Sequence, residues 1–81
     1  MTKEQWIVNA AVKQIGGVRK LARHTKISPG TISRCARGIQ VPNPNTQIRC
    51  GRLLGLDGDT VIFGTLAECK AAAGLEGDGV E

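Results

Sequence analysis

Residues 18–38 hold two short helical patterns separated by a tight turn, and this segment constrains the fold more than any other. Its clearest signal is the dipeptide Ser28-Pro29. A serine hydroxyl can cap a helix N-terminus, and a proline at the first helical position loses no hydrogen bond. Gly38 is suited to the left-handed conformation that closes many helices. The segment therefore predicts that its second helix runs from Pro29 to about Arg37.

The first helix of the pair is expected to begin at Gly17 or Val18. One side of it carries apolar or small residues, including Leu21 and Ala22, and its other sides are basic. The short side chain of Ala22 lets another helix backbone cross closely, as a steep helix-helix crossing requires. The pair is thus predicted to be a helix-turn-helix, a motif whose second helix sits on DNA.

Two further helices are predicted on either side of this pair. Residues 2–5, Thr-Lys-Glu-Gln, fit a capping box in which the first and last side chains each bond the other's backbone N–H. They predict a helix over residues 3–15 that ends at two glycines. Residues 43–44, Asn-Pro, repeat the pattern of a capping side chain before proline and predict a helix that ends at Gly55.

The acidic turn at residues 57–59 predicts a fifth helix over residues 59–73. A strand over residues 61–63, Val-Ile-Phe, is the alternative because two of these residues are β-branched. From Gly74 onward the chain is rich in glycine and acid, which predicts a flexible acidic tail over residues 74–81. The expected architecture is an all-α, five-helix domain spanning residues 1–73.

Aliphatic residues must form most of the core, because Trp6 and Phe63 are the only aromatic residues in the chain. This composition favours packed helices over a sheet. The residues expected to face inward are Trp6, Ile7, Ala10, Ala11, Ile15, Val18, Leu21, Ala22, Thr25, Ile32, Cys35 or Ala36, Ile48, Leu53 or Leu54, Leu56, Val61, Ile62, Leu66 and Cys69.

Charge is distributed unevenly along the chain. Residues 1–56 contain ten Lys or Arg and one acid, whereas residues 57–81 contain six acids and one Lys, so the local net charges are +9 and −5. Cationic side chains neutralise phosphates and release the counterions bound to them. A basic body with an acidic end therefore indicates a nucleic-acid partner, with an ordinary solvated basic surface as the alternative.

Cysteine and histidine usage argues against a metal site or a disulfide framework. Cys35, Cys50 and Cys69 are odd in number and far apart, and His24 is the single histidine. Reduced, packed thiols in the cytoplasm are expected, with no metal and no cofactor. The chain has no run of about 20 apolar residues that would span a membrane. No serine has a plausible His and acid relay, so enzymatic activity is not expected.

Residues 3–57 resemble the Cro/CI (Xre) family of helix-turn-helix regulators, which is common in bacteriophages and bacteria. The matching residues are Leu21-Ala22, Ile27-Ser28, Ile32-Ser33-Arg34, Gly38, Val41-Pro42 and Leu54-Gly55-Leu56-Asp57. The resemblance implies the lambda-repressor-like DNA-binding fold, with the helix-turn-helix at its second and third helices. Three positions depart from the pattern. Val18 stands where Gln is usual, Lys26 replaces the usual turn Gly, and Cys35 replaces a bulky apolar residue.

The resemblance also implies which residues touch DNA. It places Pro29, Gly30, Ser33 and Arg34 on the base-reading surface, and Thr31 offers a further hydroxyl there. A guanidinium can donate two hydrogen bonds to guanine O6 and N7, so Arg34 is the main expected base reader. The alternative is that Arg34 is a solvated helix arginine or contacts a phosphate. The candidates for phosphate contacts, each alternatively a solvated side chain, are Arg19, Lys20, Arg23, Ser28, Arg37, Gln40, Asn43 and Asn45.

Helix-turn-helix proteins commonly read two half-sites about one DNA turn apart, so a homodimer is expected. Ile62, Phe63 and Leu66 are predicted to form the dimer interface, and the alternative is that they cover the first helix. The function these features favour is that of a phage-encoded repressor that binds a palindromic operator in double-stranded DNA. The alternative is a protein-binding regulator with the same fold, such as an antitoxin or anti-repressor.

Overall fold

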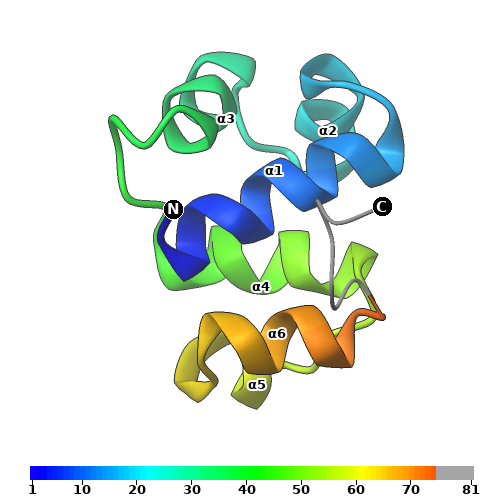
Figure 1. The fold of residues 1–81 in the computed structure, drawn as a ribbon. Coiled ribbons are helices and arrows are strands. Elements are labelled where there is room, and N and C mark those ends of the chain that lie inside the picture. Colours follow the sequence, from blue (N-terminus) through cyan, green and yellow to red (C-terminus); the bar gives the residue numbers. More distant parts are fainter. Residues whose placement is uncertain (75–81) are drawn as a thin grey trace.

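A computed structural model of the chain describes residues 1–74, and within them it contains six helices and no strand (Figure 1). The helices are α1 (Lys3–Ile15), α2 (Val18–Thr25), α3 (Pro29–Ala36), α4 (Pro44–Leu53), α5 (Gly58–Phe63) and α6 (Leu66–Ala72). The predicted all-α class is confirmed, whereas the predicted count of five helices is wrong. Except for Gly74, the predicted tail over residues 74–81 lies outside the described residues.

Helix α1 lies at the centre of the domain and contacts α2, α3, α4 and α6. Figure 1 shows α2 and α3 together on one side of α1, with α5 and α6 on the far side of α4. The helix-turn-helix pair therefore packs against α1, and the C-terminal helices do not cover it.

Side-chain caps fix the starts of the helices that the sequence predicts best. Thr2, Ser28 and Asn43 each accept a hydrogen bond from the backbone N–H three residues further on, at 3.1, 3.2 and 2.8 Å. A proline follows two of these caps at the first helical position. The predicted starts of α1, α3 and α4 are confirmed. Each start depends only on neighbouring residues, so a local sequence pattern is enough to predict it.

The predicted capping box at the start of α1 is only half formed. Thr2 accepts from the backbone of Gln5, but the Gln5 side chain does not reach back to Thr2. Its Nε2 instead donates to the carbonyl of Ala36 at 3.1 Å, and Asn9 Nδ2 donates to the same oxygen at 2.9 Å. Two amides of α1 thus satisfy a carbonyl at the end of α3 that has no partner within its own helix.

The predicted helix over residues 59–73 is divided into α5 and α6 by Gly64 and Thr65. Gly64 is extended, and a Cβ there would lie only 2.5 Å from the carbonyl oxygen of Thr60. Thr65 then begins α6 with a complete capping box to Glu68. The alternative strand over residues 61–63 is wrong, since these residues are helical in α5.

Lys3 of α1 joins the N-terminal helix to this divided region. Its ammonium donates to the carbonyls of Ile62 and Gly64, both at 3.0 Å, at the C-terminal end of α5. A cation is favourable there because the helix dipole concentrates negative charge at that end.

The core contains most of the residues that the sequence predicts, and the helix-turn-helix contributes Leu21, Ile32 and Cys35 to it. Ile15, Val18, Ile48, Leu53, Ile62 and Leu66 are only partly buried against this core. All three cysteines are free and buried. Burial raises the pKa of the Cys50 thiol from 9.0 to about 11, so this group stays protonated at neutral pH.

Candidate nucleic-acid interface

Helix α3 has one face in the core and one face in solvent. Ile32 and Cys35 are 0% and 1% exposed and hold the helix against the domain. Pro29, Gly30 and Arg34 are exposed on the other side. The N-terminal end of a helix presented in this way can enter the major groove of DNA with its side chains toward the base edges.

The residues predicted to read bases differ in exposure. Pro29, Gly30 and Arg34 are exposed, whereas Thr31 and Ser33 are half-buried. Because α-helical residues three and four apart share a face, Gly30, Ser33 and Arg34 lie together on α3. The structure therefore brings this predicted set onto one helix, and a direct role of each member in DNA contact stays a prediction.

The side chain of Arg34 lies across the start of α3 and is held on two sides. Its Nε donates to Gln40 Oε1 at 2.9 Å, and its Nη2 donates to Thr31 Oγ1 at 3.4 Å. Its Nη1 passes over Gly30, where an added Cβ would be 3.3 Å from that nitrogen. The guanidinium is thus fixed by protein groups on the exposed face of the helix.

The Ser28 hydroxyl is already engaged on both sides. It accepts from the Thr31 backbone N–H at 3.2 Å and donates its proton to Thr31 Oγ1 at 2.8 Å. A hydroxyl has a single proton, and phosphate oxygens only accept hydrogen bonds. A phosphate contact by Ser28 therefore requires that its proton turn away from Thr31.

The remaining candidates for phosphate contacts are all exposed. They lie on α2, at the end of α3 and in the following loop, and at the start of α4, and they are Arg19, Lys20, Arg23, Arg37, Gln40, Asn43 and Asn45. Asn43 uses its side-chain oxygen to cap α4, which leaves its amide N–H groups to donate. The predicted phosphate contacts thus come from three elements that follow one another in the chain.

Sequence reasoning missed the side chains that hold the motif in place. Arg49 of α4 donates from Nη1 to the carbonyl of Thr25 at 2.6 Å, which ties α4 to the end of α2. Gln5 and Asn9 do the same at the end of α3. No local pattern reveals such bonds, because donor and acceptor are more than 20 residues apart in the chain.

The turn between α2 and α3 keeps its usual form although it lacks glycine. Lys26 adopts the left-handed conformation with φ 62°, and it is the one non-glycine residue among residues 1–74 with positive φ. Its backbone N–H donates to the Ala22 carbonyl and closes α2. The turn thus forms at Lys26 without a glycine, and the chain carries the strain of a side chain in the left-handed region.

Replacing Lys26 with glycine is expected to raise the free energy of unfolding by about 0.5–1 kcal/mol. Relief of the left-handed strain is worth about 1–2 kcal/mol, and the greater freedom of glycine in the unfolded chain offsets part of it. Urea denaturation followed by circular dichroism measures the change. Lys20→Gly, inside α2, serves as the control and should lower the stability, and a loss of stability in Lys26→Gly would contradict the expectation.

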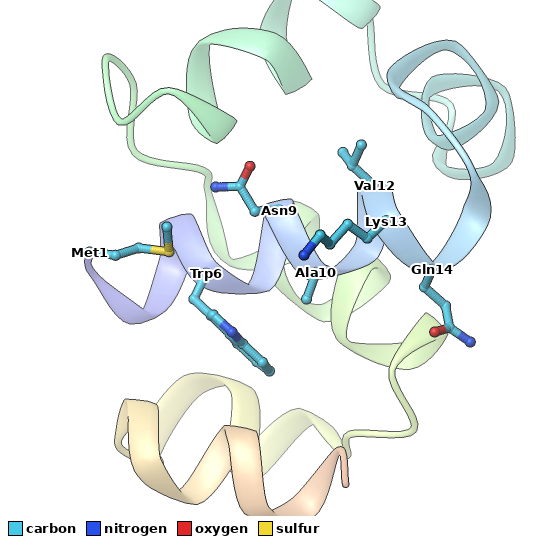
Figure 2. A pocket seen from close by; sticks show the side chains of 7 residues that line it. All are labelled: Met1, Trp6, Asn9, Ala10, Val12, Lys13 and Gln14. Carbon is cyan, nitrogen blue, oxygen red and sulfur yellow. The ribbon is translucent and has the colours of Figure 1, made fainter. Parts of the chain in front are cut away.

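A groove of about 460 Å³ runs along α1 and is separate from the predicted DNA contacts (Figure 2). Its lining includes Trp6 and Ala10, and all of its lining residues belong to the first 14 of the chain. None of the residues predicted to touch DNA lines it. The candidate DNA-binding site is the exposed face of α3 together with the exposed residues next to it.

The predicted dimer residues differ sharply in exposure. Phe63 is 82% exposed, whereas Ile62 and Leu66 are partly buried against the core.

Within residues 1–74, no group of three His, Cys, Asp or Glu side chains is placed to hold a metal ion. No helix in the described part of the chain is long and apolar enough to cross a membrane.

Helices α2 and α3 are adjacent and joined by a short turn with a left-handed residue, and α3 is exposed along one face. This arrangement defines a helix-turn-helix protein. Comparison with protein families agrees, because the family model for the helix-turn-helix domain matches residues 17–61. The chain belongs to this family, and this class of domain indicates DNA binding. No curated protein and no solved structure matches the chain.

Proposed function

We propose that this protein is a transcriptional repressor of the Cro/CI type, encoded by a bacteriophage, which binds a palindromic operator with α3 in the major groove. The observation that carries the proposal is that α3 has one face buried in the core and the opposite face exposed to solvent. Ile32 and Cys35 fix the helix in the core, and Arg34 extends from the exposed face beside Gly30. Arginine is the side chain best suited to bidentate recognition of guanine.

The charges around α3 support binding to a phosphate backbone. Arg19, Lys20 and Arg23 are exposed on α2, and Arg37 is exposed just after α3. Residues 1–56 carry a local net charge of +9. Phosphate contacts of this kind position a protein on DNA without reading sequence, and they make affinity fall steeply with salt.

Dimerisation through the C-terminal helices is part of the proposal. Phe63 offers a large apolar side chain to solvent at the end of α5, whereas Ile62 and Leu66 are partly buried against the core. An exposed aromatic residue of this kind gains by burial against a second copy. A two-fold dimer would present two copies of α3 to two half-sites of an operator.

Selection of binding sites from random double-stranded DNA tests the proposal. We expect a short palindrome to be enriched, two chains to bind each site in sedimentation, and affinity to fall steeply with salt. Arg34→Ala should weaken binding to the selected site about tenfold, since a good bidentate contact is worth about 1–3 kcal/mol. Arg52→Ala is the matched control, because Arg52 is also an exposed arginine but lies at the end of α4.

Failure to enrich any sequence would overturn the proposal and favour a protein partner for the same fold. Unchanged affinity of Arg34→Ala for the selected site would refute the role of Arg34. One chain per site would refute the dimer while leaving sequence-specific binding in place.

A further inference from the structure

We infer that Gln40, in the loop after α3, is a positioning residue that gives Arg34 its selectivity for guanine. The inference rests on the proposed function, because it concerns how the same surface reads a base. The inference assigns Gln40 a role in base specificity. Its predicted role as a phosphate contact would only hold the protein on the DNA backbone.

The path of the backbone brings residue 40 beside residue 34. Gly38 has φ 78°, a left-handed conformation that lets the chain turn back after α3. The backbone N–H groups of Ile39 and Gln40 both donate to the Arg34 carbonyl, at 3.0 and 3.4 Å. A Cβ on Gly38 would also lie 3.1 Å from the side-chain amide of Gln5, a tight contact that this side chain would have to relieve by a small shift. The loop is therefore anchored to the very residue whose side chain Gln40 contacts.

The side-chain bonds leave the far end of the guanidinium free for a base. Nε donates to Gln40 Oε1 at 2.9 Å, and Nη2 gives one bond to Thr31 Oγ1 at 3.4 Å. A guanidinium has five N–H donors, so both donors on Nη1 and one on Nη2 remain. These two adjacent nitrogens form the pair that guanine O6 and N7 accept. Gly30 leaves the space in which Nη1 lies.

Fixing an exposed arginine in advance favours the base that matches its position. A free arginine side chain samples many rotamers and loses that freedom on binding, whereas one held at Nε has already lost part of it. The held guanidinium is also less able to turn toward a different base or a nearby phosphate. Removing Gln40 should therefore reduce discrimination more than it reduces general affinity for DNA.

The test measures the dissociation constants of four DNA duplexes at one fixed salt concentration. The duplexes differ only at the base pair whose preference is lost in Arg34→Ala. Gln40→Ala is expected to reduce the preference for guanine about three- to tenfold, the range of one lost hydrogen bond. Its affinity for unrelated DNA should change less than about twofold. In an Arg34→Ala background the same substitution should have no further effect on base preference. Gln40→Glu, which keeps an oxygen acceptor for Nε, should retain the preference.

Asn45→Ala is the matched control, because Asn45 is another exposed amide residue and a predicted phosphate contact. It should weaken all four duplexes by one common factor. If Gln40→Ala behaves like this control, or if its effect persists without Arg34, the inference is overturned. A loss of preference in Arg34→Ala but not in Gln40→Ala would overturn it while leaving the proposed function intact. Equal affinity of the wild-type protein for all four duplexes would instead refute base reading itself.

Discussion

Replacing Leu21 with alanine is expected to lower the free energy of unfolding by about 2–5 kcal/mol. Leu21 is 0% exposed and is one of the largest fully buried side chains in the described part of the chain. Truncating it removes apolar contacts and leaves a cavity that the surrounding helices can fill only in part. Small domains have total stabilities of about 5–15 kcal/mol, so this single change removes a large share. Urea denaturation followed by circular dichroism measures it.

Val41→Ala is the control for this experiment, because Val41 is apolar but 76% exposed in the loop after α3. Its effect should stay within about 0.5 kcal/mol, as is usual for surface substitutions. Equal stabilities of the two variants would contradict the assignment of Leu21 to the core. A large loss in Leu21→Ala alone would show that the first helix of the motif is held by core packing as well as by hydrogen bonds at its ends.

The sequence predicts the helix-turn-helix well because its ends are determined by neighbouring residues. Ser28 caps α3 through the backbone N–H of Thr31, and Pro29 cannot continue a preceding helix. Asn43 acts in the same way for α4. Such signals do not depend on how the rest of the chain packs, so the starts of these helices follow from the sequence alone.

The division between α5 and α6 was missed although a local signal for it exists. Thr65 and Glu68 have the spacing of a capping box, and the structure forms both of its bonds. Apolar residues continue across this point, from Val61 to Leu66 and Cys69, and this pattern favours one long helix. In helices of six and seven residues the periodic pattern is too short to outweigh a cap.

The supporting contacts of the candidate site could not be predicted from the sequence. The capping-box pattern predicts that Gln5 bonds Thr2, three residues away, but the Gln5 side chain instead reaches Ala36 in another helix. The bond from Arg34 to Gln40 likewise depends on the course of the chain after Gly38. Sequence patterns indicate which residues face solvent on α3, whereas tertiary structure decides which neighbours orient them.

Replacing Gly51 with alanine tests whether close packing or helix propensity decides stability where α4 meets α5. Alanine is favoured over glycine inside a helix by about 1 kcal/mol. A Cβ at position 51, however, would lie 2.4 Å from Cγ2 of Val61, which is 0% exposed. A β-branched side chain in a helix has few alternative rotamers, so the two helices must move apart. We expect the clash to win, because overpacking costs about 1–3 kcal/mol and the propensity gain offsets about 1 kcal/mol of it. Urea denaturation should therefore show a net loss of up to about 2 kcal/mol.

The sign of the Gly51→Ala effect should reverse when Val61 is shortened to alanine, because that change removes the clashing methyl and leaves only the propensity gain. In the Val61→Ala background, Gly51→Ala should therefore be neutral or stabilising by up to about 1 kcal/mol. Gly58→Ala, where an added Cβ meets no atom within 4 Å, is the matched control and should not destabilise the protein. A destabilisation by Gly51→Ala of equal size in both backgrounds would exclude Val61 as its cause, because the two sites would then be energetically independent.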